Sequence, residues 1–165
     1  MILIALGANL SSMVGPPEAT FRAAAAALEE QGDIRLTLWS RIYRSPAWPD
    51  PSEPEFRNAV AALETALLPA ALLARLHETE ARFGRRRDIA IANAPRPLDL
   101  DLLDCDGQVS GVSPLLPHPR IHERAFVLLP LQDVAPQWRH PISGLSVASL
   151  LADLPKGLMQ GVVPV

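Results

Sequence analysis

Two aspartates interrupt a leucine-rich stretch in the middle of the chain, where residues 94–103 are Ala-Pro-Arg-Pro-Leu-Asp-Leu-Asp-Leu-Leu. Side chains alternate across a β-strand, so Asp99 and Asp101 would share one face and the leucines that alternate with them would share the other. Two ionised carboxylates on one face repel each other, and a bound cation relieves this repulsion, with Mg²⁺ favoured by oxygen ligands. The pattern therefore predicts a strand with one apolar face and one metal-binding face. A solvated edge strand with an acidic face is the alternative that the pattern alone leaves open.

The length and composition of the chain predict one folded domain that covers residues 1–165. Hydrophobic residues make up 48% and charged residues 20% of the sequence, which is typical of a protein with a core and not of a disordered chain. The net charge of −3 argues against a generally basic nucleic-acid-binding protein. Of the 15 basic residues only Lys156 is a lysine, and arginines gather between Arg82 and Arg87. Because a guanidinium group binds phosphate through paired contacts, this cluster predicts a local site for phosphate.

Cysteine usage and hydropathy predict a cytoplasmic protein. Cys105 is the one cysteine in the sequence, so an intramolecular disulfide and a cysteine metal cluster are both excluded. Residues 1–6 are apolar but lack the basic residues of a signal peptide, and no stretch approaches the roughly 20 apolar residues that cross a bilayer. We therefore expect small molecules as partners, with no membrane and no nucleic acid.

Hydrophobic periodicity predicts strands and helices in the order β-α-β-β-α-β. Apolar residues recur at helical spacing after Pro17 and after Pro69, and Gly32 and Gly84 end these two helices. The order matches the ferredoxin-like split βαβ arrangement of the α+β class: an antiparallel sheet has both helices packed on one face, and its other face is free for a ligand. Extra C-terminal elements follow from about residue 121. The predicted strands are residues 2–6, 34–43, 56–65 and 98–103, and the predicted helices are residues 17–31 and 69–83.

A proline-rich stretch and the strand after it form a second region of interest. Residues 45–54 contain four prolines and Trp48, a composition that excludes a helix or a central strand and predicts an exposed loop. In the strand that follows, Phe56 and Asn58 lie on one face, so an aromatic ring and a carboxamide are neighbours near its start. Ordinary core packing is the commoner role of a phenylalanine and remains the alternative.

Arginines flank the acidic strand. Arg85, Arg87 and Arg96 surround the loop that leads to Asp99 and Asp101, so phosphate-binding and metal-binding groups come together, as phosphoryl transfer requires. The sequence has no glycine-rich P-loop motif with its lysine, so other groups must hold the phosphates. A solvated cluster at a helix end is the alternative interpretation of the arginines.

A histidine between two prolines, in Pro117-His118-Pro119-Arg120, is a weaker candidate. The prolines hold the ring stiffly, which suits a contact with phosphate or a base, although a surface histidine usually has no such role. We interpret the nearby His122 as a surface residue.

Taken together, these segments resemble the 6-hydroxymethyl-7,8-dihydropterin pyrophosphokinase family, folate-pathway enzymes that move a pyrophosphoryl group from ATP to a pterin alcohol. The resemblance spans nearly the whole chain and is carried by five ordered blocks at suitable spacing. It implies that this chain transfers pyrophosphate from ATP to the hydroxyl of 6-hydroxymethyl-7,8-dihydropterin and releases AMP. The blocks are Ile4-Ala5-Leu6-Gly7-Ala8-Asn9-Leu10, Tyr43-Arg44-Ser45-Pro46, Phe56-Arg57-Asn58-Ala59-Val60, Pro95-Arg96-Pro97-Leu98-Asp99-Leu100-Asp101, and Pro117-His118-Pro119-Arg120 with Arg124-Ala125-Phe126.

At the phosphate end, the resemblance implies that Asp99 and Asp101 bind two Mg²⁺ ions that bridge the ATP phosphates. Arg85 and Arg96 would stabilise charge on the transferred group. The substrate hydroxyl would attack the β-phosphorus and AMP would leave, with no side chain an obvious general base. The residues implied in nucleotide binding are Arg87, His118 and Arg124.

At the pterin end, the resemblance implies that Asn58 pairs with the edge of the pterin through the donor and the acceptor of its carboxamide. Phe56 and Phe126 would stack on the two faces of the flat ring. The residues implied to border this pocket are Ser45, Pro46 and Trp48.

The sequence departs from the family pattern in two places. The family usually has Trp-Gly before the Pro-Arg dipeptide, whereas this chain has Asn93-Ala94, and the loop over residues 85–96 is one residue longer. Because an indole is missing there, closure of this loop over ATP would be weaker or would use another side chain. Phe56 stands where a tyrosine is common, which removes a hydroxyl but keeps the stacking face. We expect activity to survive both changes.

Two other functions remain open from the sequence. Ferredoxin-like sheets with arginines and aromatic residues can bind nucleic acid, but aspartates on the sheet surface would repel a phosphate backbone. A relative that binds pterin or ATP without turnover is the other alternative, motivated by the missing Trp-Gly. Formation of AMP from ATP and the pterin would separate both alternatives from the enzyme.

Overall fold

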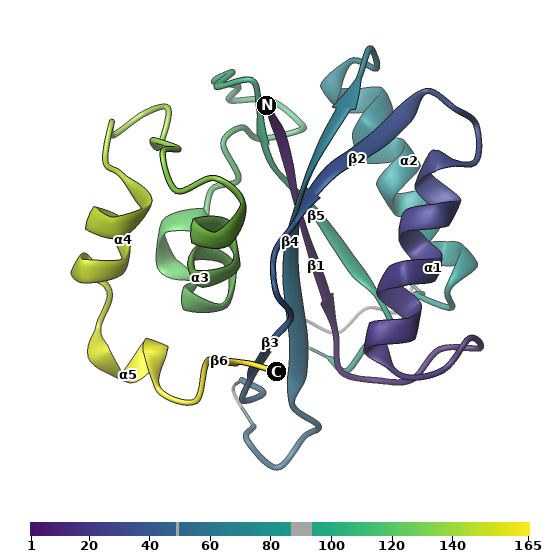
Figure 1. The fold of residues 1–165 in the computed structure, drawn as a ribbon, viewed down its shortest axis with the longest axis horizontal. Coiled ribbons are helices and arrows are strands. Elements are labelled where there is room, and N and C mark those ends of the chain that lie inside the picture. The colour runs from purple at the N-terminus through teal and green to yellow at the C-terminus, as the bar shows by residue number, and fades with distance from the viewer. Residues whose placement is uncertain (49, 87–93) are drawn as a thin grey trace.

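The computed structural model describes residues 1–48, 50–86 and 94–165, so Arg87 and Asn93 lie outside the described residues. Within these ranges, strands and helices alternate along the chain before a mostly helical C-terminal part (Figure 1). No helix in the described ranges combines the length and the apolar character that a bilayer crossing requires. The strands are β1 (Ile2–Ala8), β2 (Ile34–Trp39), β3 (Tyr43–Ser45), β4 (Phe56–Thr65), β5 (Asp99–Cys105) and β6 (Val163–Pro164); the helices are α1 (Pro17–Glu29), α2 (Pro69–Arg82), the 3-10 turn Ile121–Glu123, α3 (Ala125–Val134), α4 (Val147–Asp153) and α5 (Lys156–Met159).

The strands form one antiparallel sheet in the order β5-β1-β4-β3-β6, and β2 also pairs with β4. Strand β1 lies between β4 and β5, so that Gly7 is paired with Asn58 on one side and with Asp99 on the other. Two candidate residues that are far apart in the sequence are therefore neighbours across a single glycine.

Helices α1 and α2 cover one face of the sheet, as the sequence predicts (Figure 1). Phe21 and Leu28 of α1 and Leu76 of α2 are almost completely buried against β-strand residues such as Leu100. Burial of each such side chain stabilises the fold by about 1.5–3 kcal/mol. The predicted α+β class, with an antiparallel sheet and helices on one face, is confirmed.

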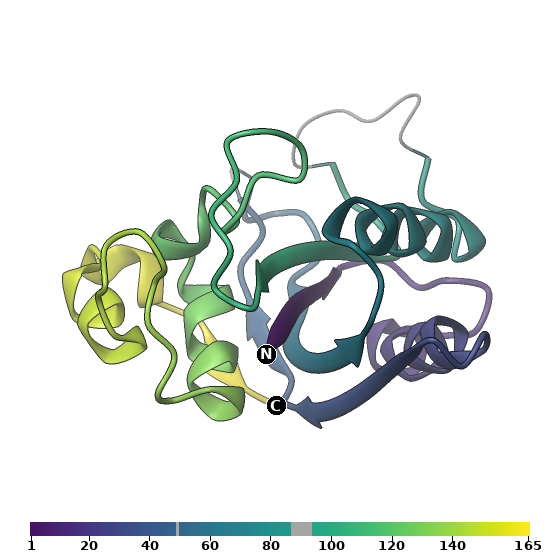
Figure 2. The ribbon, with the colours of Figure 1, turned by 90° about the horizontal axis from the view of Figure 1, so that it is seen from above.

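The expectation that the other face of the sheet is free for a ligand is wrong for the part that the C-terminal helices cover. Helices α3 and α4 pack there (Figure 2), over a second core that includes Leu3, Val60 and Leu103. The physical reason lies in α3, whose residues Ala-Phe-Val-Leu-Leu-Pro-Leu-Gln-Asp-Val are apolar on nearly all sides and must be buried. The ligand-accessible part of this face is thus confined to one end of the strands.

The predicted strand over residues 34–43 is also wrong in detail, because it is divided into β2 and β3. A register shift occurs between Leu36 and Leu38, and Ser40 both donates its backbone N–H to the Val60 carbonyl and accepts the Val60 N–H through its hydroxyl, each at 2.9 Å. As a result Leu38 and Trp39 are 48% and 41% exposed, and the simple alternation of faces ends there. The break lets β3 continue beside the start of β4.

Candidate active site

A cavity of about 890 Å³ lies between one end of strands β1, β3, β4 and β5 and residues of α3, α4 and α5. It is within the size range of small-molecule sites in proteins. His118 does not line this cavity but lies beside Asp101, and Arg87 is outside the described residues. The other predicted residues all line it: Ser45, Pro46, Trp48, Phe56, Asn58, Arg85, Arg96, Asp99, Asp101, Arg124 and Phe126.

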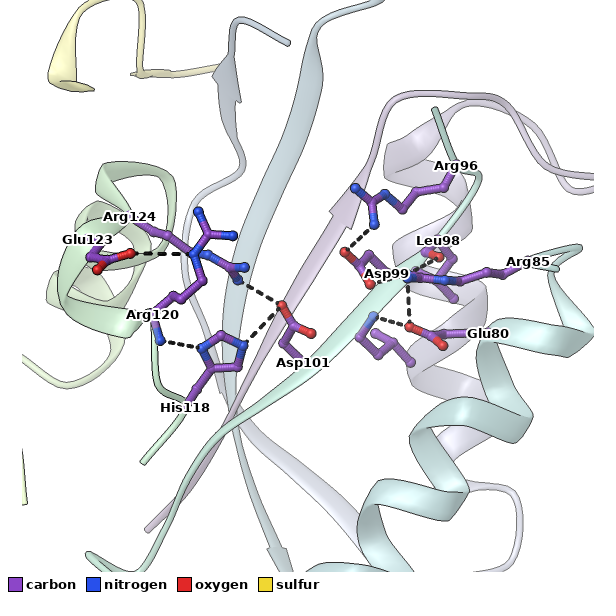
Figure 3. Close-up of polar contacts among 11 residues, drawn as sticks. Glu80, Arg85, Arg96, Leu98, Asp99, Asp101, His118, Arg120, Glu123 and Arg124 are labelled. Atoms are coloured by element: carbon purple, nitrogen blue, oxygen red, sulfur yellow. Dashed lines mark hydrogen bonds and ion pairs between the residues drawn. The ribbon is translucent and has the colours of Figure 1, made fainter. Parts of the chain in front are cut away.

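Asp99 is approached by two arginines from the side of α2 and of the segment before β5 (Figure 3). Arg85 forms an ion pair with Asp99 Oδ1, and Arg96 Nη1 lies 3.2 Å from Asp99 Oδ2. The side chains of Arg85 and Asp99 are only 12% and 22% exposed, so water screens this pair poorly. The acid pair is thus neutralised in part by the protein itself.

Asp101 is approached from the opposite side, by the segment that leads into α3 (Figure 3). Arg124 Nη1 donates to Asp101 Oδ2 at 3.0 Å, and His118 Nε2 lies 3.9 Å from the same oxygen. His118 Nδ1 accepts the backbone N–H of Arg120 at 3.1 Å, which assigns the hydrogen of the neutral ring to Nε2. Burial, followed by repulsion from Arg124 and Arg120, lowers the pKa of His118 against the opposing attraction of Asp101. His118 is therefore a neutral donor directed at the acid pair.

Glu80 of α2 is a site residue that the sequence reasoning missed. Its side chain is 1% exposed, and Oε1 accepts the Arg85 Nη1 hydrogen at 3.2 Å and the Leu100 backbone N–H at 2.7 Å. Glu80 thereby joins Arg85 to strand β5 beside Asp99. A signal was present, since position 80 follows Leu72 and Leu76 at four-residue spacing on the buried stripe of the helix, where a charge needs a partner.

Asn9 is a second residue with an unpredicted structural role. Its carboxamide oxygen accepts the Arg96 backbone N–H at 2.8 Å, and its nitrogen donates to the Pro54 carbonyl at 3.1 Å. The side chain is 6% exposed. Asn9 therefore joins the segment that carries Arg96 to the end of the proline-rich loop.

The other end of the cavity carries the carboxamide and the aromatic rings. Asn58 is 5% exposed and donates through Nδ2 to Ser45 Oγ at 2.9 Å. The guanidinium of Arg96 lies 5.7 Å from the centre of the Phe56 ring, and that of Arg124 lies 5.7 Å from the centre of the Phe126 ring. Cation–π contacts of this kind hold the arginines beside aromatic rings that line the cavity from the sheet and from α3.

Gly7 keeps the passage between the two ends open. It belongs to β1, and a side-chain carbon at this position would lie 3.7 Å from both Asn58 Oδ1 and Asp99 Cβ. A larger side chain than alanine would therefore extend into the cavity. The glycine leaves room for one ligand to reach from the carboxamide to the acids.

The donor atoms fit a magnesium–nucleotide complex better than a metal held by protein alone. In the described part of the chain, no group of three or more His, Cys, Asp or Glu side chains is arranged to hold a metal ion. Mg²⁺ commonly binds through one or two carboxylates together with substrate phosphates, which is what Asp99 and Asp101 can offer. Arg96 Nε is buried without a hydrogen-bond partner, a donor suited to an anionic oxygen.

The arrangement can bind a polyphosphate beside a flat polar ring. Arginines supply donors at the acidic end, and charge on phosphate oxygens is stabilised best where water is partly excluded. Asn58 supplies a fixed hydrogen-bonding edge at the other end. Such a cavity suits a phosphoryl transfer in which the protein positions two ligands.

Comparison with known proteins gives the family. The model of the 7,8-dihydro-6-hydroxymethylpterin-pyrophosphokinase (HPPK) family matches residues 3–136. The 2-amino-4-hydroxy-6-hydroxymethyldihydropteridine pyrophosphokinase of Pseudomonas aeruginosa is 39% identical over 155 residues, covering 93% of this chain and 91% of the relative. The enzyme of the same name from Methylorubrum extorquens is 38% identical over 152 residues, covering 91% and 94%.

Solved structures agree on the fold. A crystal structure described as HPPK-DHPS in complex with substrates matches with a TM-score of 0.64 and 12% identity, over 92% of this chain and 44% of the longer one. The Plasmodium falciparum HPPK-DHPS structure with pteroate gives a TM-score of 0.62, also at 12% identity and over 41% of its chain. This chain spans less than half of each, and at this identity the likeness concerns the fold alone. From the match over residues 3–136 and the two bacterial relatives, the chain belongs to the 7,8-dihydro-6-hydroxymethylpterin-pyrophosphokinase family.

Proposed function

We propose that this protein transfers pyrophosphate from ATP to the hydroxyl of 6-hydroxymethyl-7,8-dihydropterin, giving the pterin diphosphate and AMP in folate biosynthesis. Family membership supports a diphosphate transferase. The observation that carries the proposal is that one cavity holds both an acid pair among arginines and, across Gly7, a buried carboxamide among aromatic rings. The substrate hydroxyl attacks the β-phosphorus and releases its proton, the bond to the α-phosphate oxygen breaks, and AMP leaves with that oxygen.

Arg85 and Arg96 act on the transferred group in this proposal. Both guanidinium groups lie beside Asp99, and Arg96 has a buried Nε without a partner. They donate to phosphate oxygens and stabilise the charge that develops there, while Glu80 keeps Arg85 in place. Nucleotide binding falls to Arg124 and to His118, whose Nε2–H faces the same region. Arg87, outside the described residues, stays a prediction for this role.

Asp99 and Asp101 hold magnesium in the proposal, and two ions are expected. The two carboxylates would hold magnesium together with ATP, and the metal would supply positive charge that neutralises the phosphates. Two carboxylates on one strand face, with no third protein ligand in the described ranges, support a metal that arrives with the nucleotide. Removal of Mg²⁺ by a chelator should abolish AMP formation, and added Mg²⁺ should restore it.

The pterin binds at the end of the cavity formed by β3, β4 and α3. Asn58 is buried and already oriented by Ser45, so its free carboxamide atoms are available to the ring edge. Phe56 and Phe126 stack on the ring faces, bordered by Ser45, Pro46 and Trp48. Loss of either phenyl ring should weaken pterin binding more than ATP binding. A calorimetric titration of each ligand measures the difference.

The remaining expectations are part of the same proposal. We expect residues 1–165 to act as a single domain in the cytoplasm, on small molecules only, with neither nucleic acid nor a membrane as partner. The sequence also predicts that the loop over residues 85–96 closes over ATP without the Trp-Gly of the family. Asn93 of this loop is outside the described residues, so this closure stays a prediction.

One assay tests the proposed function. The purified protein is mixed with MgATP and 6-hydroxymethyl-7,8-dihydropterin, and the nucleotide products are separated by chromatography. Formation of AMP with equal amounts of pterin diphosphate is the expected result. Formation of ADP, or of AMP at the same rate without the pterin, would overturn the proposal.

A further inference from the structure

The wall of the cavity continues beyond the part of the chain that the family model covers. The family match ends at residue 136, yet Leu154, Leu158 and Gln160 line the same cavity as Phe56 and Phe126. Leu158 is 47% exposed, so much of its side chain is accessible to a ligand. The C-terminal segment of residues 155–162 therefore contributes side chains to the cavity wall, Leu158 and Gln160 among them, and it lies outside the residues that the family model matches.

This segment is fixed to the loop that borders the pterin end. Strand β6 pairs with β3, and the Val165 backbone N–H donates to the Ile42 carbonyl at 2.9 Å. Gly161 has a φ of +78° and lies so close to Pro46 that a Cβ there would be 2.9 Å from Pro46 Cγ. Only glycine meets both conditions without a shift of the backbone or of the proline. The pairing of β6 with β3 and the contact of Gly161 with Pro46 therefore fix the position of the segment.

The order of strands decides which substrate the segment adjoins. Across the sheet, β5 with the acid pair lies at one edge, β4 with Asn58 and β3 with Ser45 follow, and β6 lies at the opposite edge. In the view of Figure 1, the chain passes from α5 through β6 to end beside β3. Because β6 pairs with β3 and Gly161 lies against Pro46, the segment is next to the carboxamide end of the cavity.

We propose that Leu158 and Gln160 form a substrate-selecting wall of the pterin pocket, in which Leu158 packs against the rim of the bicyclic ring, between the faces stacked on Phe56 and Phe126, and Gln160 contacts its polar edge. The inference rests on the proposed function and extends it to residues outside the family match. A leucine side chain covers apolar ring surface, and a glutamine carboxamide offers both a donor and an acceptor to the alternating groups of a pterin edge. The nucleotide makes no contact with this wall.

The first test replaces the two side chains without touching the backbone. The double variant Leu158→Ala with Gln160→Ala should raise the KM for 6-hydroxymethyl-7,8-dihydropterin about tenfold while leaving the KM for MgATP unchanged. Met159→Ala is the matched control, since Met159 lies between the two residues but does not line the cavity. An unchanged KM for the pterin in the double variant, or an equal rise in both KM values, would overturn the proposal.

A second test displaces the whole segment. Gly161→Ala introduces a Cβ that meets Pro46, whereas Gly32→Ala, at a φ of +75°, has nothing within 4 Å of the added carbon. Both variants carry the same backbone strain, so only the first should raise the KM for the pterin, again with no change for MgATP. Equal behaviour of the two variants would contradict a role for the contact with Pro46.

Direct binding keeps this inference separate from the proposed function. Calorimetry with 6-hydroxymethyl-7,8-dihydropterin reports on the pocket even if no AMP is formed. If the unmodified protein binds the pterin but makes no AMP, the proposed reaction fails while the wall is still tested by the affinities of the variants. If the unmodified protein makes AMP and the variants bind the pterin as tightly as it does, the wall alone is refuted.

Discussion

Leu100 and Leu102 point from strand β5 into the core beside α1 and α2, whereas Asp99 and Asp101 point from the same strand into the cavity. The two leucines are 1% and 4% exposed, and burial of each stabilises the fold by about 1.5–3 kcal/mol. The aspartates give little net stability, because desolvation and their mutual repulsion offset the attraction of the arginines. Stability and chemistry are thus carried by opposite faces of one strand, and substitutions should separate them.

The largest effect is expected on the cavity face. Replacing Asp99→Asn and Asp101→Asn together should lower kcat by on the order of 1,000-fold or more, because charge stabilisation at the phosphates is lost. The free energy of unfolding, measured by urea titration, should change by no more than about 1–2 kcal/mol. AMP formation by the double variant at a rate near that of the parent would show that the acid pair has no catalytic role.

Asp104→Asn provides a matched control on the same strand. Asp104 is 3% exposed and accepts the Trp138 Nε1 hydrogen at 2.8 Å and the Gly107 backbone N–H at 3.1 Å. An asparagine has one acceptor oxygen in place of two, so this variant should lose about 1–3 kcal/mol of stability and keep its kcat. Together, the two experiments distinguish aspartates that are needed for catalysis, Asp99 and Asp101, from an aspartate that stabilises the fold, Asp104.

The reverse effect is expected on the core face. Leu100→Ala should lower the free energy of unfolding by about 2–5 kcal/mol, through lost burial and the cavity that remains. Under conditions where the variant is folded, its KM values for MgATP and for the pterin should equal those of the parent. A loss of substrate affinity without a loss of stability would break the separation of the two faces.

Much of this division could be predicted from the sequence because it depends on local rules. The alternation of side chains in a strand is enough to place Asp99 and Asp101 opposite the leucines. Likewise Phe56 and Asn58 share a face of β4, and that face does line the cavity. Pairing of β1 with both β4 and β5 then brings these residues together without further information.

The parts that could not be predicted depend on contacts between distant segments. Glu80 and Leu100 meet only once α2 is packed on β5, and Arg124 reaches Asp101 from a different layer of the molecule. The C-terminal wall depends on the pairing of β6 with β3. Strand β6 has only two residues and therefore no sequence pattern of its own. The break between β2 and β3 depends on the contacts of Ser40 with Val60, which hydrophobic periodicity does not predict.

A smaller effect on kcat is expected at Glu80, which contacts both Arg85 at the cavity and the backbone of Leu100 in β5. Glu80→Gln keeps an acceptor for the Leu100 N–H but removes the charge that helps to hold Arg85. We expect kcat to fall about tenfold with little change in either KM, since a misplaced guanidinium costs transition-state stabilisation. Glu78→Gln, at an exposed position of the same helix, should have no effect. Equal kcat values for the two variants would limit Glu80 to a structural role.

The smallest effect concerns His140, a buried polar residue in the segment between α3 and α4. The ring is 9% exposed, forms an edge contact with Trp138, and accepts the Ile142 and Ser143 backbone N–H groups through Nδ1 at 3.3 and 3.2 Å. Burial, and then the proximity of His122, lowers its pKa below the ordinary value of 6.5. Protonation therefore favours the unfolded chain.

The sign of the pH dependence follows from this shift. Above pH 6.5, the ordinary pKa of the unfolded histidine, both states are neutral and the stability is complete. As the pH falls toward the lowered pKa of the folded state, the unfolded chain binds the proton first and stability is lost, by at most about 1.4 kcal/mol per pH unit for one group. His140→Asn keeps an acceptor but does not titrate, so urea titrations between pH 7.5 and 5.5 should give a shallower loss than in the parent. The pKa of His118 is also lowered, so His118 contributes to the loss of stability at low pH in both proteins. If the parent and the His140→Asn variant lose stability with equal slopes, His140 is not a source of the pH dependence.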